Sequence, residues 1–224
     1  MTSRIVAIDT TSESGSLALI ESGSVLDEVS VLSAEGFGHV LFPQLERLLS
    51  RHGWSPADVD CYAAAAGPGS FTGVRVGLAA IKGLGEALGK PVVTVSNLQA
   101  VAWHGTALLR AAVLDARRGE VYGAVYSAAL KLVLPERVLG FSAWVDMLPE
   151  IGLEFLSTDF SAFAAELAQT RFRDAPRRTV PRALAAAVGR IAADRLAAGL
   201  ATDPAAADAN YVRRSDAELL WKEP

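Results

Sequence analysis

Apolar positions in the first hundred residues recur at strand-like and helix-like spacings. Three short aliphatic runs, Arg4–Asp9, Ser16–Ile20 and Ser24–Val31, are separated by turn residues. We expect them to form an antiparallel meander. Val40–Ser50 follows with leucines at helical spacing, and Pro43 falls where a first helical turn tolerates proline.

The pattern then alternates between strand and helix. Val59–Ala66 predicts a fourth strand, Thr72–Leu88 a second helix and Pro91–Val95 a fifth strand. The expected order is strand, strand, strand, helix, strand, helix, strand. A hairpin start followed by crossover units predicts a mixed sheet with helices packed against it.

The second half repeats this order in abbreviated form, without a residue-by-residue match. Its expected elements are a short helix from Ser96, strands at Ala111–Asp115, Val121–Tyr126 and Lys131–Leu139, a helix at Ala143–Leu148, a strand at Leu153–Ser157 and helices at Phe160–Gln169 and Arg182–Ala198. We therefore predict a first lobe over residues 1–100 and a smaller second lobe over 101–180. Helix 182–198 and the tail are expected to pack back on the first lobe.

The stretch from Cys61 to Leu88 holds an unusual concentration of glycine. Gly67-Pro68-Gly69 breaks a small apolar strand, and Ser70 or Thr72 can cap the helix that follows. The amides at such a helix start form a candidate anion site. This segment predicts a loop of the phosphate-binding type.

Several glycines lie inside the helix itself. Each costs about 0.5–1 kcal/mol relative to alanine in a helix interior. Gly73 and Gly77 share one face, next to an apolar stripe that includes Val74, Leu78 and Ile81. We infer that another backbone approaches this helix closely.

Composition limits the classes of function. The chain has 224 residues, 51% hydrophobic, with a formal net charge of −4, which argues against a surface built to bind nucleic acid. The single cysteine, Cys61, excludes an internal disulfide and suits a reducing compartment. Because we find neither a signal-peptide run nor ~20 consecutive apolar residues, we expect a cytoplasmic protein without a membrane partner.

Two half-repeats around a cleft describe the architecture of actin, the Hsp70 ATPase and sugar kinases, a duplicated ribonuclease H-like α/β fold. In that architecture the first hairpin carries an acidic residue beside the nucleotide phosphates. Asp9 stands at this place, followed by Thr10, Thr11 and Ser12. The alternative is that Asp9 ends a strand and satisfies local turn amides.

Three segments carry a family resemblance. They read IVAIDTTSESGSLALI, GPGSFTGVRVGLAAIKGLG and LDARRGEVYGAVY. The chain resembles the bacterial TsaB (YeaZ-type) proteins of tRNA threonylcarbamoyladenosine biosynthesis, relatives of the TsaD/Kae1 family. The resemblance extends to about Tyr126, weakens beyond Lys131 and returns faintly at Asn210-Tyr211-Val212-Arg213.

The resemblance implies a subunit without catalytic residues. The catalytic relative TsaD carries a His-x-x-x-His metal pair after the strand that matches Pro91–Val95. Asn97 and Val101 occupy those two places here, and valine cannot bind a metal. We therefore expect no metal, no required cofactor and no transferase activity of its own. The implied partners are a TsaD-type catalytic subunit in a heterodimer and a TsaE-type ATPase, with tRNA reached through the complex.

The predicted partner interface is formed by the two amphipathic helices Val40–Ser50 and Thr72–Leu88. We expect them to pack together as an exposed helical face, which would also support a homodimer when the partner is absent. An apolar stripe at this spacing is, however, more often core than interface. The residues predicted to line this face are His39, Leu41, Leu45, Leu48, Gly73, Val74, Gly77, Leu78 and Ile81.

The alternative function is a small ATPase or kinase of the same fold. The second half looks too short for a complete adenosine pocket, but weak ATP or ADP binding, mainly at the level of the complex, is compatible with either function. The candidate nucleotide contacts are Asp9, Thr10, Thr11, Ser12, Gly67, Gly69, Ser70 and Thr72.

Arginines outside these sets leave alternatives open. Arg75 suits a carboxylate or phosphate, or a surface ion pair. The hairpin tip suits a solvated turn, or a role at the cleft or on a partner surface; its charged residues are Asp115, Arg117, Arg118 and Glu120. The run Arg171, Arg173, Arg177 and Arg178 is better explained as a solvated charge run than as a tRNA contact.

Overall fold

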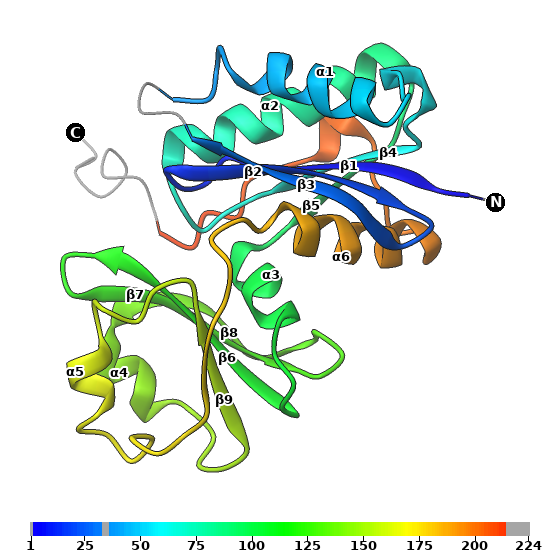
Figure 1. Ribbon diagram of the computed structural model, residues 1–224. Coiled ribbons are helices and arrows are strands. Elements are labelled where there is room, and N and C mark those ends of the chain that lie inside the picture. Colours follow the sequence, from blue (N-terminus) through cyan, green and yellow to red (C-terminus); the bar gives the residue numbers. More distant parts are fainter. Residues whose placement is uncertain (1, 33–35, 214–224) are drawn as a thin grey trace, which may run out of the picture.

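The computed structural model describes residues 2–32 and 36–213 and shows an α/β molecule with two lobes (Figure 1). Each lobe is built on a five-stranded mixed sheet. Helices cover both faces of the two sheets, so the described chain is layered helix, sheet, helix, sheet, helix. In this described part no helix is long and apolar enough to cross a bilayer.

The first sheet has the strand order β3-β2-β1-β4-β5. The antiparallel meander predicted at its start is confirmed, and β4 and β5 add parallel to β1. The strands are β1 (Arg4–Asp9), β2 (Ser14–Glu21), β3 (Ser24–Leu32), β4 (Cys61–Ala65) and β5 (Val92–Val95).

Alternating side chains of this sheet enter two different cores. Helices α1 (Leu41–Arg51) and α2 (Phe71–Leu88) cover one face and α6 (Ala185–Ala197) covers the other. On β1, Val6 and Ile8 pack toward α1 and α2, while Ile5 and Ala7 pack toward α6. The period of two in a strand produces this division.

The second sheet repeats the plan in the order β10-β9-β6-β7-β8. Short helices α4 (Phe141–Asp146) and α5 (Ala164–Leu167) lie on one face and α3 (Asn97–Trp103) on the other. The strands are β6 (Leu109–Arg117), β7 (Glu120–Ser127), β8 (Leu132–Gly140), β9 (Leu153–Ser157) and β10 (Arg177–Thr179).

One local prediction for the second lobe was wrong. The helix expected over Phe160–Gln169 is a single turn, Ala164–Leu167. Part of the basic run, Arg177–Thr179, is a short parallel edge strand on β9, although all three residues are exposed. Backbone pairing with β9 orders this segment without any apolar pattern.

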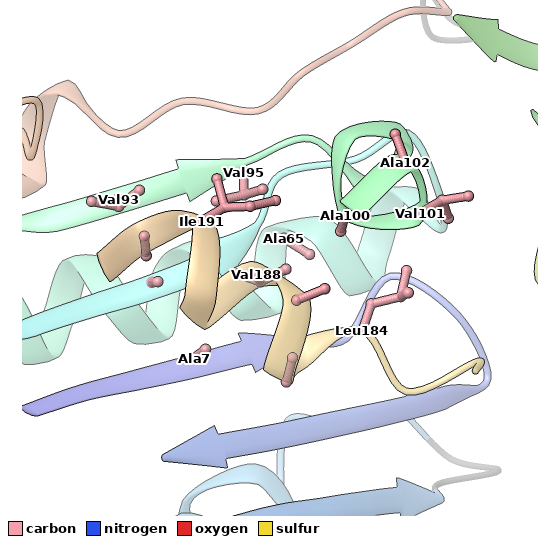
Figure 2. Close-up of a cluster of buried hydrophobic side chains, with 14 of the residues drawn as sticks. Ala7, Ala65, Val93, Val95, Ala100, Val101, Ala102, Leu184, Val188 and Ile191 are labelled. Carbon is pink, nitrogen blue, oxygen red and sulfur yellow. The ribbon is translucent and has the colours of Figure 1, made fainter. Parts of the chain in front are cut away.

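Helices α3 and α6 form a middle layer shared by both sheets. Figure 2 shows Ile191 of α6 beside Val95 of β5 and Val188 of α6 beside Ala65 of β4. Val101 of α3 belongs to the same buried cluster. The same buried cluster continues into the second sheet through Ala112, Ala124 and Leu156. One continuous apolar core therefore joins the lobes.

The glycines of α2 meet the backbone of the turn that follows β1. A Cβ at Gly73 would lie 1.8 Å from the carbonyl oxygen of Thr10, and one at Gly77 would lie 2.8 Å from the Thr10 hydroxyl. The inference that a backbone approaches this helix is confirmed. The neighbour belongs to the same chain, so these glycines do not serve contact with a partner.

The predicted partner face needs a correction. Of its nine residues only His39 is exposed, because the first sheet requires an apolar cover and the two stripes provide it. The buried members are Leu41, Leu45, Leu48, Gly73, Val74, Gly77, Leu78 and Ile81. A partner that docked on these helices would have to contact their other side chains.

Two alanine substitutions in α2 should have opposite effects. We expect Gly73→Ala to lower the free energy of unfolding by about 3 kcal/mol, because its methyl group overlaps the Thr10 carbonyl. Gly83→Ala meets nothing within 4 Å and should raise it by about 0.5–1 kcal/mol. Urea unfolding measures both. Equal effects at the two positions would contradict the proposed contact.

Candidate functional site

A cleft of about 800 Å³ lies between the lobes. The first lobe contributes the turn after β1 and the loop before α2, and the second contributes the β6–β7 hairpin and the loop after β9. Gly67 lies behind the lining, bonded to Asn97 and Asn210. The predicted nucleotide contacts that line the cleft are Asp9, Thr10, Thr11, Ser12, Gly69, Ser70 and Thr72.

Asp9 is the buried carboxyl group on the floor of this cleft. Its Oδ1 accepts hydrogen bonds from the amide and the hydroxyl of Thr11, at 2.9 and 2.6 Å. Its Oδ2 is buried and has no hydrogen-bond partner among the described residues. Burial raises the pKa of Asp9, against the opposing effect of the Thr11 and Asn97 hydrogen bonds. One oxygen of Asp9 therefore accepts hydrogen bonds from the turn that follows β1, as expected for a residue that ends a strand. The other oxygen has no partner among the described residues.

Asn97 ties the two loops of the first lobe together. Its Nδ2 donates to the Thr11 hydroxyl at 2.6 Å, and its Oδ1 accepts from the amide of Gly67 at 2.9 Å. Val101, one helical turn later, is buried in the shared core. At the two positions where the resemblance implied a histidine pair in TsaD, one side chain is thus held by hydrogen bonds and the other is apolar.

The loop before α2 is closed against the turn after β1. Ser70 caps the helix by accepting from the amide of Gly73 at 3.2 Å, which decides between the two candidate caps. The amide of Ser70 donates to the Thr11 carbonyl at 2.7 Å, and the Thr10 hydroxyl donates to the Gly73 carbonyl at 2.7 Å. Two amides that an anion would need are bonded within the chain.

A C-terminal strap, Asn210–Arg213, bridges the lobes beside the cleft. The amide of Asn210 donates to the Ala66 carbonyl at 2.8 Å, and its Nδ2 donates to Glu136 of β8 at 2.5 Å. Arg213 donates to the Ala116 carbonyl at 3.0 Å and pairs with Glu120.

Only a faint signature in the sequence marks the strap, because hydrogen bonds between distant segments leave no local pattern. The β6–β7 hairpin that Arg213 contacts also lines the cleft through Asp115 and Arg117. This hairpin therefore lies at the cleft, one of the places considered for it.

Arginines of the basic run bond to other residues of the second lobe. Arg171 donates to the carbonyls of Val145 and Leu148, and Arg178 pairs with buried Glu154 at 2.7 Å. Such bonds hold these guanidinium groups in place and disfavour a role in tRNA contact.

Comparison with known proteins identifies the family. The family model described as "TsaD: tRNA N6-adenosine threonylcarbamoyltransferase" matches residues 32–221. The Escherichia coli K12 protein called tRNA threonylcarbamoyladenosine biosynthesis protein TsaB is 33% identical over 192 residues, covering 73% of this chain and 83% of that protein. The chain belongs to the TsaB family. Its TsaD-family match agrees with the predicted TsaB–TsaD kinship.

Solved structures of TsaB-like proteins support the same assignment. YeaZ from Pseudomonas aeruginosa is 28% identical, with a TM-score of 0.75 over 93% of this chain and 99% of that one. An activator of 2-hydroxyisocaproyl-CoA dehydratase from Clostridium difficile, solved with bound ADPNP, is 8% identical with a TM-score of 0.50 over 89% and 97% of the two chains. The second likeness concerns the fold alone. The predicted two-lobed, actin-like α/β fold is confirmed.

Asp9→Asn should stabilise the fold in a pH-dependent way. A carboxyl group whose pKa is raised on folding destabilises the folded state when the pH is above its ordinary pKa, which is 3.8 for this residue. We expect a gain of about 1–3 kcal/mol near pH 7, because asparagine keeps the shape of the side chain and removes its buried charge. The gain should vanish near pH 4. Urea unfolding across this range checks the result, and a gain independent of pH would contradict it.

Breaking the strap should loosen the second lobe from the first. We expect Arg213→Ala to lower the free energy of unfolding by about 1.5–3 kcal/mol, because it removes charge-assisted bonds to Glu120 and Ala116. Amide exchange in the β6–β7 hairpin should accelerate. Arg173→Ala, which removes an exposed pair with Asp174, is the matched control and should change stability by less than about 0.5 kcal/mol.

Proposed function

We propose that this chain is a non-catalytic, cytoplasmic subunit of tRNA threonylcarbamoyladenosine biosynthesis. It pairs with a TsaD-type catalytic subunit and works with a TsaE-type ATPase. The names of its relatives support the pathway. Its formal charge of −4 supports a role in which tRNA is bound through the complex.

The contact between Gly73 and Thr10 carries the non-catalytic part of the proposal. The two loops that would flank a phosphate contact each other. The amides of Ser70 and Gly73, which a phosphate would need, donate hydrogen bonds within the chain instead. Many enzymes that act on nucleotides open and close their cleft during turnover. The shared core and the strap both resist such movement.

We assign the contact with the partner subunit to a row of exposed residues along α2. Phe71, Arg75, Ala79, Gly83 and Ala87 follow one another at intervals of four residues and are all exposed. α2 lies in the outer layer of the first lobe, away from the second sheet (Figure 1). Three of the five side chains are small, so a partner helix can approach the backbone closely. Together with His39 and Phe42 beside it, this row replaces the buried stripe as the predicted partner face.

A small ATPase remains the second candidate because of one observation. The unpartnered Oδ2 of Asp9 lies at the floor of the cleft and would suit a cation or a donor. The close contact between Thr10 and Gly73 leaves no room for a phosphate between them, and this counts against phosphoryl transfer at that point. We propose instead that any ATP or ADP binding is weak and belongs mainly to the complex.

Reconstitution with the TsaD-type and TsaE-type subunits tests the proposal. We expect tRNA threonylcarbamoylation to require this chain, and Ala79→Glu to reduce complex formation and product at least about tenfold, because a charge enters a close helix contact. Its melting temperature should stay within a few degrees, since Ala79 is exposed. Ala165→Glu, on exposed α5, is the matched control. Val74→Glu and Leu78→Glu are unsuitable because both side chains are buried.

The ATPase candidate predicts a different outcome. The chain alone would then hydrolyse ATP, Asp9→Ala would abolish hydrolysis, and Ala79→Glu would leave it unchanged. That result would overturn the non-catalytic proposal.

A further inference from the structure

The strap Asn210–Arg213 contacts both lobes within four residues. Its contact with the first lobe is at the start of α2, where the Tyr211 hydroxyl accepts a hydrogen bond from Nε of Arg75 at 3.2 Å. The ring of Tyr211 also packs on Phe71, with 5.6 Å between the two ring centres. Tyr211 is 50% exposed and Phe71 is 42% exposed. Because Phe71 belongs to the exposed row of α2, a partner on that row would also cover Tyr211.

The other end of the strap contacts the β6–β7 hairpin. The Arg213 guanidinium donates to the Ala116 carbonyl at 3.0 Å and to the Glu120 carboxylate. It also lies over the ring of Tyr122, with 5.6 Å between the guanidinium carbon and the ring centre. Ala116 and Glu120 stand directly before and directly after the turn of the hairpin. One side chain of the strap therefore fixes both strands where they meet the turn.

The turn between these two contacts is strained. Arg117 and Arg118 have φ angles of 67° and 57°, in the left-handed region that favours glycine. That conformation raises the free energy of residues with a Cβ, and it persists only where the surroundings impose it. The Arg117 amide donates to Oδ1 of Asp115 at 2.7 Å, and Arg213 holds the residues on either side. The strap is therefore part of what keeps the turn in this conformation.

Release of the strap would give the hairpin a second conformation. Without the bonds from Arg213, the strained turn would relax, and Asp115 and Arg117 would leave the cleft that they now line. Tyr211 and Arg213 are separated by one residue, so displacement of one end of the strap displaces the other. The hairpin of the second lobe and the first turn of α2 are thus joined through four residues.

We propose that the strap couples the partner face to the cleft, so that a TsaD-type subunit covering Tyr211 also holds the β6–β7 hairpin in its cleft-lining conformation. The inference rests on the proposed function, which places this partner on α2. A partner that binds only the docked strap raises the free energy needed to release it. By linkage, release of the strap weakens partner binding by the same factor. Tyr211 and Arg213 act here as positioning residues.

Amide hydrogen exchange of residues 115–122 tests the coupling. Mass spectrometry compares the chain alone, diluted until sedimentation velocity finds a monomer, with the chain saturated by the TsaD-type subunit. We expect protection of the hairpin to rise at least about tenfold in the complex. With Tyr211→Ala the complex should still form at saturation, and the rise in protection should fall below about twofold, because the link to α2 is lost.

Further variants separate coupling from local packing. Tyr211→Phe keeps the ring on Phe71, so the partner should still raise hairpin protection by more than about fivefold. Arg213→Ala removes the contact with the second lobe, and calorimetric titration should find the dissociation constant of the partner raised at least about threefold. A purely local role in the hairpin would leave that constant unchanged. Leu108→Ala, at an exposed site of the second lobe, is the matched control and should change neither quantity.

The outcomes distinguish the coupling from the proposed function. A complex that forms without any change in hairpin protection would overturn the coupling and leave the proposed function standing. An equal rise in the wild type and in Tyr211→Ala would also overturn it, because the partner would then act on the hairpin by another route. A chain that does not bind the TsaD-type subunit in the titration would overturn the proposed function, and the coupling with it.

Discussion

The contact between α2 and the turn after β1 is the constraint on which the rest of the first lobe depends. Glycine at position 73 lets the helix backbone lie directly against the Thr10 carbonyl. Any other residue type would bring its Cβ too close to that oxygen. The inward face of α2 is thereby committed to its own chain. The same contact closes the loop at the cleft and turns the opposite face of the helix to the outside.

The middle layer gives the molecule a second constraint. Helix α6 packs on the first sheet, α3 packs on the second, and the two helices pack on each other, so the lobes share apolar side chains that separate domains would keep apart. Arg195 of α6 strengthens this joint through Gln99 of α3, and Gln99 in turn donates to the Leu130 carbonyl of the second lobe. Such a joint restrains the two lobes relative to each other, as the scaffold role proposed above requires.

Much of the fold followed from the sequence because strands with two buried faces and capped helices have strong local patterns. The strand Arg4–Asp9 and the helix with its Ser70 cap and Gly89 end lie within one residue of their expected bounds. An amphipathic stripe, however, says that a face is covered and does not say by what. For this reason the sequence alone is compatible with a partner on the stripes of α1 and α2, whereas in the structure the first sheet covers them.

The cleft was partly predictable for the same reason. Asp9 and the glycine loop follow directly after strands whose ends had been located, so their proximity could be expected. The roles of Asn97 and of the strap could not, since each depends on bonds between segments far apart in the chain. The tail was expected to dock on the body, and the part that includes Trp221 lies outside the described residues.

The late position of α6 in the chain affects synthesis on the ribosome. The strands of the first sheet are made early, yet the helix that covers their second face spans residues 185–197. While the second lobe is being translated, Ile5, Ala18 and Ile20 have no cover on that side. The nascent first lobe therefore stays incomplete until α6 has emerged, and during this period its uncovered sheet is open to chaperones or to aggregation.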